Sequence, residues 1–241
     1  MRSRSGAMEL IGALMVLSLV VVAAAAPILA PHDPTRAVAP TYGEPAPPSL
    51  AFPFGTDELG RDVLSRIIFG ARISLIVGVA GMLVTMTIGV AIGLAAGFFR
   101  GATDFILMRF TDVMLTLPAL LLAMALVAVL SPSLVNILIV IGLVSWTQVA
   151  RVVRAEALSV SQRDFVMAAL STSGTLLLDA GLSFLGLGVP PPIPSWGRMI
   201  QEAELYFRVA PWLAAFPGIA IFYAVLGFNL YGYGYLKRQS R

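Results

Sequence analysis

The sequence predicts an all-α protein that crosses a membrane with about six helices. Of its 241 residues, 58% are hydrophobic and only 12% are charged, about half the charged fraction of an average soluble domain. The charged residues are clustered, which leaves uncharged runs of 21 residues (10–30) and 27 residues (73–99). About 20 apolar residues in a helix cross the hydrocarbon core of a bilayer, so both runs are long enough to span it.

Several kinds of chemistry are excluded by residue types that are absent or rare. The chain has no cysteine, which excludes disulfides, iron–sulfur clusters and thiol chemistry. His32 is the only histidine, which argues against a histidine-based metal site. Lys237 is the only lysine and follows no glycine-rich turn, so the chain cannot form a phosphate-binding GxxxxGK(S/T) loop. Any ATP that the protein uses must be hydrolysed by another polypeptide.

Residues 1–30 are predicted to form the first membrane helix. Arg2 and Arg4 precede the uncharged run from Leu10 to Ala30. A basic start, an apolar run and a row of alanines are also typical of a cleaved signal peptide. Because the run is long enough to span a bilayer, we favour a retained helix.

Residues 31–71 are predicted to lie outside the membrane. The segment 32–53 contains six prolines and lacks hydrophobic periodicity, which indicates an extended linker. Thr56 or Asp57 is then predicted to cap a short amphipathic helix, which would lie on the membrane surface or pack on its own protein. Its apolar face comprises Leu59, Val63, Leu64, Ile67 and Ile68, and its polar face comprises Glu58, Arg61, Asp62, Ser65 and Arg66.

A stripe of small residues marks the span predicted over residues 73–99. Residues four apart lie on one face of a helix, and small side chains let two membrane helices approach closely. We therefore expect this face to pack tightly against another helix and to allow bending or sliding there. The stripe consists of Gly81, Thr85, Gly89, Gly93 and Gly97.

Four further apolar runs complete the predicted spans. A loop of residues 151–173, between the second and third of these runs, is long enough to hold a short surface helix. Loops on the cytoplasmic side of a membrane carry an excess of Lys and Arg. With both termini in the cytoplasm, the inner segments hold ten basic residues and the outer segments six, which favours that topology. The four runs are residues 113–130, 134–150, 174–189 and 212–230.

Three residues stand out within these runs. Proline has no backbone N–H to donate to the helical hydrogen-bond pattern. We therefore expect Pro118 to kink its span and Pro217 to interrupt the last one. Asp179 is the one acidic residue deep within a predicted span, and intramembrane acids are often functional. It could line a translocation path or pack between helices, and the sequence favours neither role.

Short motifs follow one another in a characteristic order between about Phe54 and Asn229. They include Phe54-Gly-Thr-Asp-Glu-Leu-Gly-Arg-Asp62, Gly70-Ala-Arg-Ile-Ser-Leu75, Ala150-Arg-Val-Val-Arg154, Gln162-Arg-Asp-Phe-Val-Met-Ala-Ala169, Ala180-Gly-Leu-Ser-Phe-Leu-Gly-Leu-Gly188 and Pro192-Ile-Pro-Ser-Trp-Gly197. In this order the chain resembles the inner-membrane permease subunits of dipeptide, oligopeptide and nickel ABC importers. Such importers have two related permeases, and the chain resembles the second type. The resemblance implies the type I ABC importer permease fold.

The resemblance also implies an organisation and a set of partners. Residues 1–30 would be an N-terminal membrane helix, 31–71 an external segment, 72–231 the permease core and 232–241 a cytoplasmic tail. A similar but non-identical permease would form the other half of the translocation path. Two cytoplasmic ATPases would bind ATP and Mg, and an external solute-binding protein would deliver the substrate. The chain itself would be a non-enzymatic, cofactor-free subunit of the bacterial inner membrane.

In this family a cytoplasmic loop with an Ala-Ala pair, here Ala168-Ala169, docks in a groove on the ATPase. The resemblance implies that this segment couples ATP hydrolysis to transport, because small residues let a helix backbone seat deeply in a partner's cleft. Arg163, Asp164 and Phe165 would flank the pair and supply charged and aromatic contacts. The family usually has Glu before the pair, where this chain has Met167.

The chain departs from the family pattern in two further places. After Ala169 the family's downstream glycine, its Leu-Pro pair and much of the next helix are not found, so about 20 residues, one membrane span, are missing. Either the protein carries a deletion or the sequence omits a stretch. We favour the second, because the 16 apolar residues that follow barely cross a bilayer. The family also tends to read Gly-Asp-Gly where this chain has Gly232-Tyr233-Gly234.

Two other function classes fit single features of the sequence. An intramembrane serine protease would use Ser183 as its nucleophile, but general-base activation needs a nearby imidazole, and His32 lies in the predicted external loop. A free-standing channel or carrier would use an ionisable residue within a span, such as Asp179. For an importer subunit, Asp179 and Ser183 are candidates to line the translocation path. Short peptides are the expected substrate, and nickel chelates are the alternative.

Overall fold

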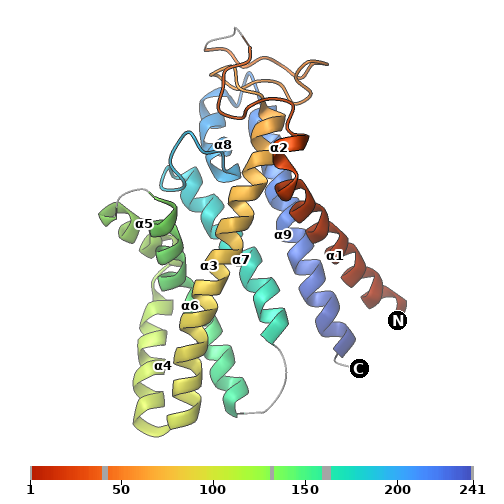
Figure 1. Cartoon of the computed structure of the whole chain (residues 1–241). Coiled ribbons are helices and arrows are strands. Elements are labelled where there is room, and N and C mark those ends of the chain that lie inside the picture. The colour runs from red at the N-terminus through yellow and green to blue at the C-terminus, as the bar shows by residue number, and fades with distance from the viewer. Residues whose placement is uncertain (1, 40–42, 131–132, 159–163, 240–241) are drawn as a thin grey trace.

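The computed structural model describes residues 2–39, 43–130, 133–158 and 164–239 (Figure 1). Within these ranges the regular structure is helical, apart from one isolated antiparallel bridge between Thr56 and Asp62. The predicted all-α fold is therefore confirmed. The helices are α1 (Arg2–Ala24), α2 (Ala26–Leu29), α3 (Val63–Phe99), α4 (Gly101–Thr116), α5 (Ala119–Val129), α6 (Leu134–Leu158), α7 (Asp164–Phe184), α8 (Trp196–Ala203), the short 3₁₀ helix η1 (Glu204–Tyr206) and α9 (Trp212–Gln239).

Four helices are long and apolar enough to cross a membrane on their own. They are α1, α3, α6 and α9, and α4 with α5 makes a fifth candidate, a broken span bent by 89°. α7 lies in the same bundle, in contact with α3 and α9 (Figure 1). The predicted multi-pass architecture is thus confirmed, with four to five candidate spans among the described residues.

The bundle has two distinct ends (Figure 1). α8 and the described chain between α2 and α3 cover one end, which we call the outer end after the predicted topology. The N-terminus and the C-terminus both lie toward the opposite, inner end. Termini on the same side are expected for an even number of crossings.

The predicted surface helix does not form a separate element. α3 begins only at Val63, and residues 63–71 are its first turns, continuous with the span. The cap is Asp62, whose carboxylate accepts the backbone N–H groups of Leu64 and Ser65. The predicted cap Asp57 accepts the N–H groups of Leu59 and Arg61 instead, and this local turn competes with helix formation.

The loop predicted over residues 151–173 is also largely helical. α6 continues to Leu158, and α7 begins at Asp164. Residues 164–173 are therefore the first turns of α7 and run directly into the apolar segment after them. In the described part of this region, no separate surface helix stands between the two spans.

α3 and α6 pack along the stripe of small residues. At Gly89, an added Cβ would lie 2.6 Å from Cβ of Val149, and at Gly93 it would lie 2.6 Å from the carbonyl oxygen of Ala150. Atoms cannot approach so closely, so the observed helix spacing requires glycine at both positions. Gly81 and Gly97 face α6 in the same way, opposite Ile141 and Ala157.

The two prolines within spans have different effects. At Leu117-Pro118 the chain leaves α4 and turns by 89° into α5. Leu117 has the extended backbone that a residue before proline prefers (φ −84°, ψ 130°). α9, in contrast, runs through Pro217 without interruption, so the prediction of a broken last span is wrong. Pro217 is the sixth residue of α9; it lacks the N–H that would bond the carbonyl of Leu213, and the helix continues past it.

Candidate functional site

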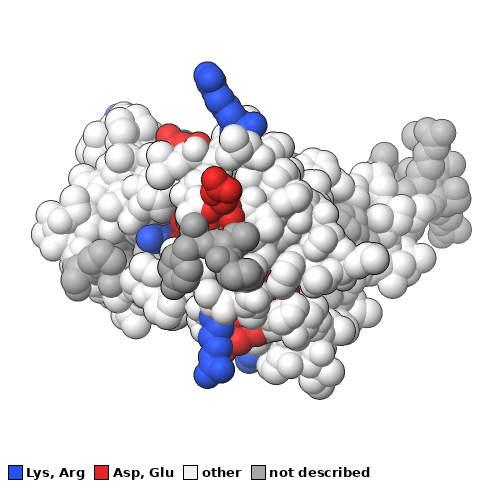
Figure 2. Space-filling model, turned by 90° about the horizontal axis from the view of Figure 1, so that it is seen from above, with Lys and Arg blue, Asp and Glu red and all other residues white. Residues whose placement is uncertain are grey.

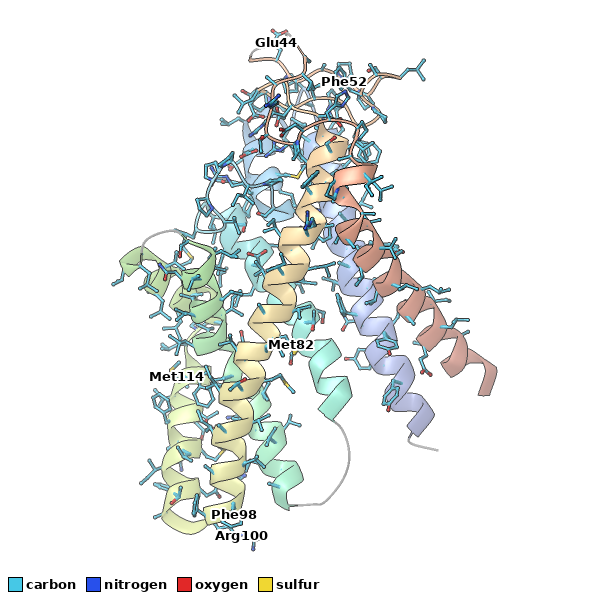
Figure 3. All side chains as sticks on the ribbon, in the orientation of Figure 1. Glu44, Phe52, Met82, Phe98, Arg100 and Met114 are labelled. Atoms are coloured by element: carbon cyan, nitrogen blue, oxygen red, sulfur yellow. The ribbon has the colours of Figure 1, made fainter. Side chains whose placement is uncertain are left out.

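A groove opens on the side of the bundle between the α4–α5 break, α6 and α7. Its volume is about 900 Å³, and we call it the lateral groove. Met114, labelled in Figure 3, lies in the last turns of α4 next to the break and lines the groove with Leu117 and Pro118. α6 contributes residues 144–152, and α7 contributes residues from Ser171 to Gly181.

In the described part of the chain, the polar residues that line the lateral groove are uncharged. Gln148 is exposed, whereas Thr85 is only 2% exposed and its hydroxyl has no hydrogen-bond partner. The hydroxyl of Thr175 lies 2.9 Å from the Gly78 carbonyl and can donate to it. The groove therefore offers neutral hydrogen-bond donors and acceptors. Its polar residues are Thr85, Ser145, Thr147, Gln148, Ser171 and Thr175.

Asp179 and Ser183 lie on a different face of α7 and do not line the lateral groove. Both are buried, and the Ser183 hydroxyl donates to the Asp179 carboxylate at 3.4 Å. Asp179, Ser74 and Trp196 border a cavity of about 10 Å³, which has room for about one water molecule. The structure thus places Asp179 among α3, α7, α8 and α9, a position suited to helix packing. Its role in a translocation path stays a prediction.

The expected ATPase-coupling residues lie at the start of α7. The backbone of Asp164, Phe165, Met167 and Ala168-Ala169 is helical, and Arg163 lies outside the described residues. In Figure 1 the start of α7 lies nearer the middle of the bundle than the end of α6 does. Docking of this segment on an ATPase stays a prediction.

Two ion pairs join α4 to α6 toward the inner end. Arg154 donates to both carboxylate oxygens of Asp104, at 2.5 and 2.6 Å, and Arg151 lies 2.5 Å from Asp112. Arg109 and Asp112 are three residues apart and lie 3.8 Å from each other, a looser contact. Sequence analysis missed the pairs between helices because their members are 39 and 50 residues apart.

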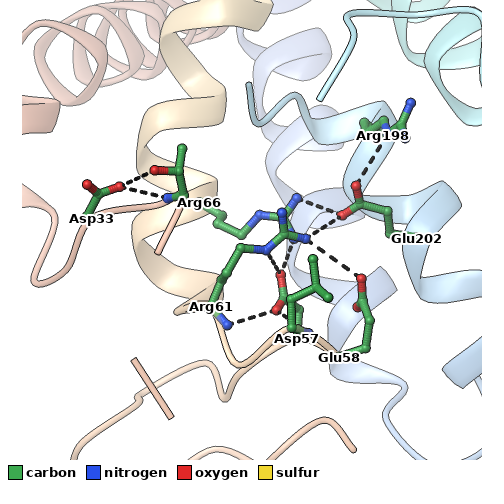
Figure 4. Close-up of polar contacts among 9 residues, drawn as sticks. Asp33, Asp57, Glu58, Arg61, Arg66, Arg198 and Glu202 are labelled. Carbon is green, nitrogen blue, oxygen red and sulfur yellow. Dashed lines mark hydrogen bonds and ion pairs between the residues drawn. The ribbon is translucent and has the colours of Figure 1, made fainter. Parts of the chain in front are cut away.

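A buried network of charged residues lies at the outer end (Figure 4). Arg61 donates to Asp57 at 2.7 Å and to Glu202 of α8 at 3.2 Å. Arg66 bonds the same two carboxylates, with 2.7 Å to Glu202. Arg198 contacts Glu202 at 3.3 Å. We call these five residues the outer ion network; it fastens the turn before α3 to α8.

The pKa values of two carboxyl groups at the outer ion network are shifted in opposite directions. Burial raises the pKa of the Glu58 carboxyl above its ordinary value. Burial acts on Glu202 in the same direction, but the charge and hydrogen bond of Arg66, with help from Arg61, outweigh it and hold the pKa of Glu202 below its ordinary value. Glu202 is therefore ionised at neutral pH.

The outer ion network is not built as a metal site. Carboxylate oxygens of Asp57, Glu58 and Glu202 come within 4.8 Å of one another, close enough to share a cation. The guanidinium groups of Arg61 and Arg66 already contact these carboxylates. Two fixed positive charges in that space would repel a metal ion, so the residues present do not fit one.

In Figure 2, the outer face shows few charged side chains, widely scattered.

The residues of the protease hypothesis lie in separate environments. His32 is held at the outer end, with Nδ1 3.3 Å from Asp62 and its backbone N–H donating to Ser65. Ser183 is buried beside Asp179. The imidazole needed to activate a serine is thus occupied elsewhere, and the structure does not favour a protease.

Comparison with known proteins identifies the family. A family profile described as "Binding-protein-dependent transport system inner membrane component" matches residues 89–175. The di/tripeptide transport system permease protein DppC of Pseudomonas aeruginosa is 38% identical over 257 residues, 92% of this chain and 84% of the relative. DppC of Alkalihalophilus pseudofirmus, a dipeptide transport system permease protein, is 34% identical over 94% of this chain and 83% of the relative.

A third relative comes from a different transport system. The glutathione transport system permease protein GsiD of Escherichia coli O6:K15:H31 is 38% identical over 265 residues, 97% of this chain and 86% of the relative. The alignments are longer than the 241 residues of this chain, so the relatives carry internal residues that it lacks. This supports the expectation that a stretch of the family sequence is missing, and the profile match ends at residue 175, shortly after Ala169.

The fold and the sequence relatives both indicate a multi-pass membrane permease. The helical bundle contains several membrane-spanning helices, a broken span and a groove beside it. Relatives at 34–38% identity cover more than nine tenths of the chain, far beyond the motifs themselves. The chain belongs to the inner-membrane permease family of binding-protein-dependent ABC importers, in the group that resembles dipeptide and oligopeptide permeases, and it has the type I importer permease fold.

Proposed function

We propose that this chain is one permease subunit of an ATP-driven importer of short peptides. The observation that carries the proposal is the set of relatives named as dipeptide, di/tripeptide and glutathione permeases, each matched over more than nine tenths of the chain. All three substrate names denote short peptides. Nickel chelates are the alternative substrate of the wider group, and none of these relatives is named for nickel.

The proposed assembly supplies what the chain lacks. It contains a second, homologous permease, two cytoplasmic ATPases that bind ATP and Mg, and an external solute-binding protein. The chain has a single lysine and no phosphate-binding loop, so its own role is to form half of the path without catalysis or a cofactor. The assembly lies in a bacterial inner membrane with both termini of this chain in the cytoplasm, as the distribution of basic residues favours.

ATP-driven closure of the ATPases is proposed to act through the start of α7. A rocking of helices between outward- and inward-open states would be a two-state motion that ATP binding biases. Ala168-Ala169 would take up the movement of the ATPase, with Arg163, Asp164 and Phe165 beside it. α7 is continuous from Asp164 to Phe184, so a push at its start would pass along the helix to the lateral groove.

Two measurements test the proposal. Affinity capture of the tagged chain from native membranes is expected to recover a second permease and two ATPases. Cells that carry the system are expected to take up a labelled dipeptide in an ATP-dependent manner. Recovery of the chain alone, or accumulation of a nickel chelate with no uptake of dipeptides, would contradict it.

The coupling segment has its own test. Replacing Ala168 with Glu and Ala169 with Arg is expected to reduce co-purification of the ATPases and to abolish uptake, because bulky charged side chains prevent close docking. Ala102→Glu, at an exposed position near the inner end of α4, is the control for added charge and should leave both unchanged. Normal assembly and uptake in the double variant would rule out coupling through this segment.

A further inference from the structure

The lateral groove combines neutral polar groups with a broken helix. Among the residues that the structure describes, its lining includes Thr85, Ser145, Gln148 and Ser171 and no Asp, Glu, Lys or Arg. Polar side chains that face lipid tails lose their hydrogen bonds to water at a cost of several kcal/mol. Most of the described lining is apolar, but Gln148 is exposed and Ser145 and Ser171 are partly exposed, so these three side chains can bond water or a polar ligand in the groove.

The backbone at the groove adds further hydrogen-bonding groups. Pro118 has no N–H, so the carbonyl of Met114, four residues before it, lacks its helical donor. The first N–H groups of α5, from Ala119 onward, likewise lack helical acceptors. Interrupted membrane helices occur where backbone lines a cavity, and transporters place substrates at such interruptions.

One buried side chain points independently to a ligand. The hydroxyl of Thr85 borders the groove, is buried and has no hydrogen-bond partner, although Thr87, two residues away, donates to the carbonyl of its own helix at 2.8 Å. A buried hydroxyl without a partner costs about 1–3 kcal/mol. A water or a ligand in the groove could supply the missing partner.

We propose that the lateral groove contacts the peptide during its passage and binds the peptide main chain through these uncharged groups. Amide N–H and C=O groups of a peptide match the hydroxyl, carboxamide and free backbone groups of the groove. The volume of about 900 Å³ lies within the range of small-ligand sites. Because the described residues of the lining carry no charge, the groove is expected to accept cationic, anionic and neutral peptides alike.

The acidic residue in the spans does not alter this charge neutrality. Asp179 lies on another face of α7, among Ser74, Trp196 and Ser183. The ion pairs of Asp104 and Asp112 with α6 border a separate cavity closer to the inner end. This inference rests on the proposed function, because it names the part of the path that touches the transported peptide.

The absence of cysteine from the chain allows a direct test by single-cysteine labelling. Gln148→Cys places the chain's one thiol in the groove, and Thr87→Cys places it at an exposed position of α3 outside the groove lining. Both tagged variants are studied in native membranes that hold the whole importer. The rate of reaction with a water-soluble, charged thiol reagent is measured with and without excess trilysine, triglutamate or trialanine.

We expect the thiol at position 148 to react readily and all three peptides to slow its reaction at least threefold. The thiol at position 87 should react slowly, with no change on adding peptide. An unreactive thiol at 148 would mean that lipid or a partner helix covers the groove. That result, or protection by peptides of one charge only, would overturn the proposal.

Charge substitutions supply a second readout. Gln148→Glu is expected to raise the uptake of trilysine relative to triglutamate several-fold, and Gln148→Lys is expected to shift the ratio in the opposite direction. An unchanged ratio in both variants would overturn the role of the groove while leaving peptide import intact. Failure of the wild-type system to take up any peptide would overturn the proposed function, and the groove proposal with it.

Discussion

Individual residues of the outer ion network join parts of the chain that are far apart in sequence. Arg61 and Arg66 lie just before and within α3, and each bonds Glu202 of α8, 141 and 136 residues away. Arg66 is 3% exposed and Asp57 is 2% exposed. Charges that are removed from water to this degree are stable only while they remain paired.

Removing one member of the network should therefore destabilise the outer end. Glu202→Gln leaves Arg66 buried with one carboxylate partner fewer, and breaking a buried pair costs about 3–5 kcal/mol. We expect a clear fall in the melting temperature of the detergent-solubilised protein. Glu204→Gln, at an exposed position two residues further along the chain, is the control and should change it little. Equal melting temperatures for wild type and Glu202→Gln would show that the network does not stabilise the fold.

The same residue predicts how stability depends on pH. The folded-state pKa of Glu202 lies below its ordinary value of 4.5, so its contribution to stability is fully present above that pH and is lost as the pH falls through the folded-state pKa. Glu58 has a raised pKa, and its effect has the opposite sign. The difference in melting temperature between wild type and Glu202→Gln should be constant from pH 7 to about 5.5 and shrink below 4.5. A difference that grows in acid would contradict the pairing.

Among the elements, α3 and α6 form a closely packed pair of spans. Gly89 and Gly93 bring the α3 backbone against Val149 and Ala150. In a membrane, this kind of packing replaces the hydrophobic effect as the force that holds helices together. The pair forms a wall of the lateral groove through Thr85 and Gln148, so its spacing also determines the shape of the groove.

A Gly→Ala substitution, made at two positions in turn, distinguishes the effect of close helix packing on stability from the effect of helix propensity. At Gly89 an added methyl group meets Val149 at 2.6 Å, whereas at Gly218 of α9 no atom lies within 4 Å. Gly89→Ala should lower the melting temperature through overpacking, which costs about 1–3 kcal/mol. Gly218→Ala should leave it unchanged or raise it slightly, since alanine favours a helix by up to about 1 kcal/mol. Equal effects at the two positions would argue against close packing of α3 on α6.

The whole molecule has an outer end formed by α8 and the described residues between α2 and α3, and an inner end toward which both termini lie (Figure 1). A thiol at Leu50, which is fully exposed at the outer end, and one at Ala102, at the inner end of α4, lie on opposite sides of the proposed membrane. In intact cells without an outer-membrane barrier, a membrane-impermeant thiol reagent should label Leu50→Cys at once. It should label Ala102→Cys only after the membrane is opened. The reverse order would place the termini outside.

Sequence patterns alone determined the helical, membrane-spanning character of the chain. The uncharged runs, the spacing of Gly89 and Gly93 and the position of Pro118 follow from local chemistry and from the period of a helix. The structure places the two glycines against α6 and Pro118 at the break between α4 and α5. The motifs between Phe54 and Gly197 indicated the family. Local signals were less reliable at element boundaries: Asp57 formed a turn instead of a cap, and Pro217 was absorbed near the start of α9.

Tertiary structure alone decided which residues meet. Glu58, Arg61 and Arg66 were expected on the polar face of a surface helix, yet the fold buries the arginines against Glu202 of α8. Asp179 was equally suited to a path or to packing, and only the rotation of α7 turned it away from the lateral groove and left Gly181 there. The physical reason is that periodicity specifies which residues share a face of one helix. Which neighbour covers that face depends on packing between segments more than a hundred residues apart.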